Sequence, residues 1–207
     1  MIRRSILAVP VAAVLASAVV AGCGGSGGSH SGSSTSQGSS SGQQPGPAPK
    51  ESNPPGDIPD NQVYVAYHPA GGGFTVKVPE GWARASAHGA TTFSDKLNSI
   101  QISSARAAGA PTVRSIDATV VPQLKKQQPS FSPGKVTAVS RQGGQAIRIT
   151  YQADSAPNQV TGKVVRDAVE RYTFFHQGRQ VTLTLTGPVN ADNVDPWRIV
   201  SDSFRWQ

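Results

Sequence analysis

Histidine side chains are the first candidates for chemistry, because imidazole binds metals and transfers protons near neutral pH. His68, His88 and His176 lie far apart beside predicted turns, and His30 lies in a stretch rich in Gly and Ser. None of them has an acidic or cysteine partner at the spacing of a metal-ligand motif. The sequence therefore predicts no metal site and no cofactor.

Two pairs of carboxylates raise the question of glycoside hydrolysis, which uses two such groups on either side of one bond. Asp167 and Glu170 fall within a predicted strand, where residues three apart face opposite sides. Asp192 and Asp195 precede a predicted helix, where carboxylates favour the helix N-terminus. The sequence also lacks a Gly-x-Ser-x-Gly motif and a phosphate loop. We therefore predict that the chain is not an enzyme, and a cell-wall glycosidase is the weakest alternative.

The amino terminus has the layout of an export signal. Two arginines lie within the first four residues, and residues 5–20 form an apolar run that is short for a membrane span. We therefore predict a signal peptide over residues 1–22. Arg3 and Arg4 also resemble part of the twin-arginine signal, so general secretion and twin-arginine export both stay open.

The only cysteine of the chain, Cys23, follows this segment directly, so no internal disulfide is possible. Val20, Ala21, Gly22 and Cys23 resemble the lipobox of bacterial lipoproteins. The resemblance implies recognition of Val20, Ala21 and Gly22 by the signal peptidase and a diacylglyceryl group, with palmitate, on Cys23. It places the mature chain at the outer face of the cytoplasmic membrane, with the membrane as a partner through the lipid.

Residues 23–61 consist mainly of Gly, Ser, Gln and Pro, with no aliphatic residue from Gly24 until Ile58. Such a segment cannot bury enough apolar surface to offset its ordering entropy, so we predict a disordered tether and a folded domain over residues 62–207. From Gln62 onward the chain has 16 basic and 9 acidic side chains, and the basic ones are scattered. This pattern argues against nucleic acid as a partner.

The domain has the alternation of half-buried strands. Apolar residues alternate with polar ones around Phe74, Ile100, Ile147 and Val181. Lys163 to His176 reads as a longer strand with an imperfect pattern that suggests a bulge or an exposed stretch. A turn at Gln177-Gly178 should join this strand to the Val181 strand as a hairpin. These segments predict one antiparallel β-sheet.

Two segments have helical spacing. Thr112 is a plausible N-cap for a helix that Pro122 would kink or split, and Asp195 with Pro196 should begin a second helix near the end of the chain. Trp197, Val200 and Phe204 should face inward from this second helix. The fold class expected is α+β, a single antiparallel β-sheet flanked by helices.

Four further side chains are candidates for the rim of a pocket. Trp82 follows a predicted turn and Trp206 lies at the end of the chain, so each can pack or form a rim. Tyr67 and His68 precede Pro69 in a similar setting. Core packing is the expected role of Trp197.

Several motifs together resemble actinobacterial lipoproteins of the LpqN type, whose domain is related to the PsbP-like α/β/α sandwich. They are the segments 73–82 (GFTVKVPEGW), 93–95 (FSD), 98–100 (NSI), 183–188 (LTLTGP) and 195–206 (DPWRIVSDSFRW). The resemblance covers most of the domain. It implies a non-enzymatic accessory or adaptor domain, and in mycobacterial relatives a part in handling cell-envelope lipids, with no catalytic residues to carry over.

We therefore expect a membrane-anchored extracytoplasmic lipoprotein whose domain is a binding or adaptor module of the cell envelope, with an envelope protein as its partner. The alternative is a carrier or sensor of an apolar envelope lipid. A carrier needs an internal cavity of several hundred Å³, roughly the size of a small-molecule site, whereas an adaptor can have a filled core.

Overall fold

The computed structural model describes residues 54–207, which form two β-sheets and two helices. In chain order the elements are β1 (Tyr64–Tyr67), β2 (Phe74–Pro79), β3 (Ala83–Ala87), β4 (Ala90–Asp95), β5 (Asn98–Arg106), α1 (Val113–Gln127), β6 (Ser132–Arg141), β7 (Gly144–Asp154), β8 (Arg166–His176), β9 (Arg179–Pro188), α2 (Val194–Ser203) and β10 (Arg205–Trp206). Within this range no helix has the length and apolar character needed to cross a bilayer.

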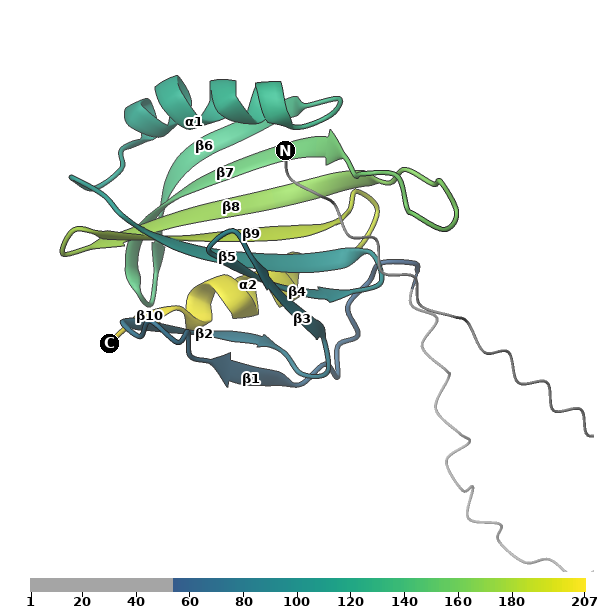
Figure 1. Cartoon of the computed structure of the whole chain (residues 1–207), viewed down its shortest axis with the longest axis horizontal. Helices are drawn as coiled ribbons and strands as arrows, with labels where there is room; N and C mark the ends of the chain where they lie inside the picture. Colours follow the sequence, from purple (N-terminus) through teal and green to yellow (C-terminus); the bar gives the residue numbers. More distant parts are fainter. Residues whose placement is uncertain (1–53) are drawn as a thin grey trace, which may run out of the picture. The chain divides into compact units, whose positions relative to one another are not determined.

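The larger sheet has seven antiparallel strands in the order β3-β4-β5-β9-β8-β7-β6. The helix α1 lies over one face at the β6–β7 side, and α2 lies on the opposite face together with β1, β2 and β10 (Figure 1). The three-layer α+β arrangement agrees with the predicted fold class. The large sheet therefore has apolar side chains on both faces.

The expectation of a single sheet was wrong, because β1, β2 and β10 form a separate three-stranded sheet. The end of the chain returns along β2, with Trp206 opposite Phe74 and Arg205 opposite Thr75. Gly81, with a φ of +82°, turns the chain out of β2 into β3, which pairs only with β4 in the other sheet. Alternation shows which side of a strand is apolar, but it does not show which neighbour the strand has.

Most of the predicted strand faces are confirmed. Phe74, Val76 and Val78 are all buried, as are Val181, Leu183 and Leu185. The turn between β8 and β9 is a hairpin with positive φ at both Gln177 and Gly178. The register of β8 is regular, and the bulge lies instead in β6, between Pro133 and Val136.

Two hydrophobic clusters fill the layers on either side of the large sheet. The cluster on the α2 side centres on Phe204, whose ring stacks on Phe174 with centroids 4.1 Å apart. The cluster on the α1 side contains Ile116 and Leu124 of the helix, packed on β7 and β8. Several core side chains on the α2 side have no exposed area, including Phe174, Leu183, Leu185, Val200 and Phe204.

The helix ends follow the predicted capping only in part. Thr112 caps α1 as predicted, with its hydroxyl accepting a hydrogen bond from the Ser115 N–H at 3.0 Å. The helix continues through Pro122 as one element. The helix α2 begins two residues earlier than expected, at Val194, with Asn193 in the N-cap position.

The packed domain begins before the expected boundary at Gln62. Ile58 is only 4% exposed and belongs to the core cluster on the α2 side. Its backbone N–H donates to the side chain of Asn193 at 2.9 Å, and the Gly56 carbonyl accepts from Asn98 and Asn193. These buried contacts attach residues 56–58 to the domain, although the surrounding composition is that of a tether.

Candidate functional site

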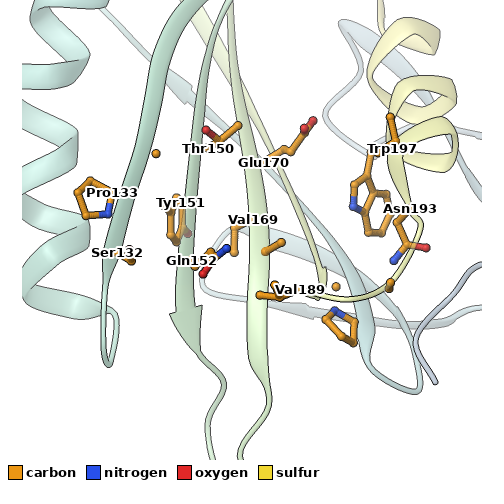
Figure 2. Close-up of a pocket in the computed structure, with 16 residues that line it drawn as sticks. Ser132, Pro133, Thr150, Tyr151, Gln152, Val169, Glu170, Val189, Asn193 and Trp197 are labelled. Carbon is orange, nitrogen blue, oxygen red and sulfur yellow. The ribbon is translucent and has the colours of Figure 1, made fainter. Parts of the chain in front are cut away.

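A groove with a volume of about 410 Å³ lies between the strands β6 to β8 and the start of α2 (Figure 2). It opens to solvent and has both polar and apolar walls. The residues that line it are Ser132, Pro133, Gly134, Thr150, Tyr151, Gln152, Ala168, Val169, Glu170, Gly187, Pro188, Val189, Ala191, Asn193, Val194 and Trp197.

Cross-strand register places the polar groups of this groove. Thr150 of β7 lies directly opposite Glu170 of β8, and Figure 2 shows both projecting from the sheet, with Trp197 on the facing helix. Side chains opposite one another on two strands share a face, so both groups point toward α2. Trp197 is 6% exposed, which confirms the predicted core role while leaving it part of the wall.

A network of charged and polar side chains holds Glu170 in place. Tyr172 donates to Glu170 Oε2 at 2.5 Å, and Arg148 Nη1 lies 3.8 Å from Glu170 Oε1. Arg141 in turn donates to the Tyr172 hydroxyl at 3.2 Å. Charge-assisted hydrogen bonds of this kind fix the orientation of a carboxylate more firmly than neutral ones.

The same network connects the sheet to α2. Arg141 Nε lies 3.1 Å from Ser201 Oγ and 3.2 Å from Asp202 Oδ1, and its guanidinium lies 5.2 Å from the centroid of the Tyr172 ring. Burial raises the pKa of Tyr172, and the hydrogen bond to Glu170 raises it further. Tyr172 therefore stays protonated at neutral pH and keeps its hydrogen bond to Glu170.

The structure places three of the four carboxylates that the sequence analysis considered. Asp167 lies opposite Ala153, on the α1 side of the sheet, while Glu170 faces the groove. Asp195 pairs with Arg198 at 3.0 Å on the surface of α2. Glycoside hydrolysis needs both carboxyl groups at one bond, so Asp167 and Glu170 on opposite faces of the sheet cannot act together.

The four predicted rim residues do not share one site. Tyr67 lines a second hollow, of about 300 Å³, and Trp206 lines a third, of about 270 Å³, beside His176. His68 and Trp82 line none of these three hollows, and Trp82 packs partly against the core. Among residues 54–207, no group of three or more His, Cys, Asp or Glu side chains is placed to hold a metal ion.

Cys23, with Val20, Ala21 and Gly22, lies outside the residues that the structure describes. Lipidation of Cys23 therefore stays a prediction from the sequence. Thr150, which lines the groove, and Arg141, which bonds to Tyr172, were not predicted as site residues, and Glu170 was weighed only as half of a carboxylate pair. The mixture of charges within the apolar pattern of β8 was the signal in the sequence for Glu170.

Comparison with known proteins concerns the fold. The solution structure of cyanobacterial PsbP (CyanoP) from Synechocystis is similar, with a TM-score of 0.51 and 14% sequence identity over 73% of this chain and 98% of that one. The domain has a PsbP-like fold. No family model matches the sequence, and no curated protein matches it.

Two other solved structures are similar to a lesser degree. LpqN, a protein involved in cell-envelope biogenesis in Mycobacterium tuberculosis, has a TM-score of 0.45 and 14% identity, over 72% of this chain and 92% of that one. The yeast Ran-binding protein Mog1p has a TM-score of 0.43 and 10% identity, over 62% and 79% of the two chains. A shared fold at 14% sequence identity does not assign a function to this chain.

Proposed function

We propose that the chain is an LpqN-type lipoprotein, anchored through Cys23 to the outer face of the cytoplasmic membrane, whose PsbP-like domain is a non-enzymatic adaptor. The signal-like segment and the lipobox resemblance of Val20, Ala21, Gly22 and Cys23 support the anchor. The groove between β7, β8 and α2 supports the adaptor, because it is open and its walls offer both apolar surface and hydrogen-bonding groups.

The occupant that fits the groove best is an extended segment of an envelope protein. Pro133, Pro188 and Trp197 offer apolar surface, while Thr150 and Glu170 offer hydrogen-bonding groups on the same floor. Polypeptide has this same mixture of apolar side chains and polar backbone, and the few polar groups of a site set the orientation of its ligand. The bulge in β6, between Pro133 and Val136, interrupts the pairing of β6 with β7 at one wall of the groove.

The filled core favours an adaptor over a lipid carrier. The space between the large sheet and α2 contains Phe174, Leu183 and Phe204, all with no exposed area. An acyl chain held between sheet and helix would have to displace these side chains. Because native interiors are packed to crystal-like density, that displacement would cost the contacts of several large residues.

Site-specific photo-crosslinking tests the groove. A benzophenone amino acid at Val189, which lines the groove and is 37% exposed, should give a discrete crosslinked protein in cells that make the full lipidated chain. The matched control is the same substitution at Val160, which is 93% exposed and lies in the loop between β7 and β8. Equal yields from both positions, or no product from Val189, would overturn the proposed adaptor role of the groove.

Two measurements test the rest of the proposal. Cys23→Ala should move the protein from the membrane fraction to the soluble extracytoplasmic fraction, because the acyl chains supply the membrane affinity. Native mass spectrometry of the purified protein should show the polypeptide without an added ligand. A co-purifying lipid of defined mass would favour the carrier function instead.

A further inference from the structure

A second hollow, of about 300 Å³, has the composition of an anion site. It lies where β1 and the loop before β2 meet β3, β4, β5 and the start of β9. Two arginines, Arg84 and Arg179, line it together with the hydroxyl groups of Tyr67, Ser86 and Thr91. No aspartate or glutamate lines it.

Arg179 is held in position by backbone and not by a carboxylate. Its Nη1 donates to the Gly72 carbonyl at 2.9 Å. The guanidinium lies so close to Gly73 that a Cβ on that residue would come within 1.9 Å of Nη1. The φ of Gly73 is +85°, so both the conformation and the space require glycine there. A guanidinium has five N–H donors, so Arg179 keeps donors for a ligand.

Arg84 is held in position by aromatic rings. Its guanidinium lies 5.0 Å from the centroid of Tyr67 and 5.8 Å from that of Phe93, and the two rings pack edge to face. Such stacking orients the planar group while leaving its N–H edges free to bind an oxyanion. The ion pairs found within residues 54–207 include neither Arg84 nor Arg179.

Strand register adds further positive charge at this corner. Arg106 of β5 lies directly opposite Arg179 of β9. Like charges directly opposite one another destabilise a sheet. An anion bound at Arg179 would offset this repulsion, and no carboxylate lines the hollow to do so.

We propose that this hollow binds the phosphate group of a ligand through Arg84 and Arg179. Tyr67 donates to Thr91 Oγ1 at 3.1 Å, and Ser86 Oγ lies 3.2 Å from the same atom, so a chain of hydroxyl groups lines the wall. The free N–H donors of two guanidinium groups, with the one hydroxyl hydrogen that this chain leaves over, outnumber the two oxygens of a carboxylate and suit a tetrahedral anion. The site is separate from the groove and does not depend on the proposed adaptor function.

Isothermal titration of the full lipidated chain in neutral detergent, at constant ionic strength, tests the site. The probes are inorganic phosphate and glycerophosphoglycerol, the soluble headgroup of a phospholipid. Saturable binding of either probe is expected, and tighter binding of the second would identify a lipid headgroup as the source of the phosphate. Arg84→Gln and Arg179→Gln should each weaken binding at least tenfold, as expected for the loss of a charge-assisted contact.

Arg114→Gln is the matched control, because Arg114 is exposed on α1 and the substitution removes the same charge. It should leave the affinity within about twofold, because Arg114 does not line the hollow and salt screens an exposed charge. Thermal unfolding without ligand checks that the variants fold, and the exposed Arg84 provides a test even if Arg179→Gln does not fold. Absence of saturable binding of both probes, or equal weakening by Arg114→Gln, would overturn the site.

Discussion

The side chain of Asn193 is the buried link between the first described residues, the large sheet and α2, and its removal should be costly. It is 4% exposed, its Oδ1 accepts from the Ile58 N–H at 2.9 Å, and its Nδ2 donates to Gly56 O and Asn98 Oδ1, both at 3.0 Å. Asn193→Ala leaves the Ile58 N–H and Asn98 Oδ1 without these partners. A buried polar group left unsatisfied costs about 1–3 kcal/mol, so we expect a loss of roughly 2–4 kcal/mol in the free energy of unfolding.

Urea unfolding of the mature chain with Cys23→Ala, followed by tryptophan fluorescence, measures this loss. The midpoint should fall while the slope stays constant, because the area exposed on unfolding does not change. Asn158→Ala is the matched control. The Asn158 side chain accepts from the N–H groups of Val160 and Thr161 at 3.0 and 2.9 Å in an exposed loop, where water replaces it. Equal losses for the two variants would refute the reasoning, because burial is the main difference between them.

Deletion of residues 54–61 extends the same test. The deletion removes the Ile58 N–H and the Gly56 carbonyl, which are two of the three partners of Asn193. Asn193→Ala should therefore cost less in the shortened chain than in the complete one, with a coupling free energy of about 1–3 kcal/mol. If the losses in the free energy of unfolding from the two changes were fully additive, residues 56–58 would not stabilise the domain through the Asn193 amide.

Three further changes test the electrostatics and packing of the domain. Burial raises the pKa of Asp167 to about 6, and the charge of Asp154 adds to the shift. Since this pKa lies above that of the unfolded chain, the protonated carboxyl stabilises the folded domain below about pH 4. This contribution to the free energy of unfolding is lost as the pH rises through 6. Asp167 is only half-buried, so after solvent screening Asp167→Asn should be about 1 kcal/mol more stable than the parent at pH 7 and equal to it at pH 4, measured by urea midpoints. Phe204→Ala should lower the free energy of unfolding by about 3–5 kcal/mol in the same assay, because the ring is fully buried against Phe174. Thr112→Ala should cost about 1 kcal/mol, measured by thermal unfolding, because the N-cap bond to the Ser115 N–H is lost.

The strands that alternate cleanly could be predicted because a half-buried strand must place its apolar residues on one side. Phe74, Val76 and Val78 follow this rule, and so do Val181, Leu183 and Leu185. In β8 charged residues face both helix layers: Glu170 is satisfied by Tyr172 on one side, and Asp167 lies toward α1 on the other. The pattern of β8 is therefore irregular although its pairing is not, which is why a bulge was expected there.

The division into two sheets and the start of the domain could not be predicted, because both depend on contacts between residues far apart in sequence. The strand β10 has two residues, too few for any alternation, and it pairs with β2 more than a hundred positions earlier. In the sequence, Ile58 is a single apolar residue among prolines and charged residues. The hydrogen bond from the Ile58 N–H to the Asn193 side chain joins residues that are far apart in sequence, so it is visible only in the structure. Local pattern carries no information on partners at such separations.

The grouping of arginines at the second hollow also could not be predicted from local sequence. In the sequence Arg84, Arg106 and Arg179 look like three isolated solubility charges, because nothing near them repeats or clusters. Register places Arg106 opposite Arg179, while stacking on Tyr67 brings Arg84 to the hollow that Arg179 also lines. An arginine on a strand usually gains its partner from the neighbouring strand, yet here the neighbours are a second arginine and a histidine. The anionic ligand proposed above would supply the counter-charge that these strand neighbours do not.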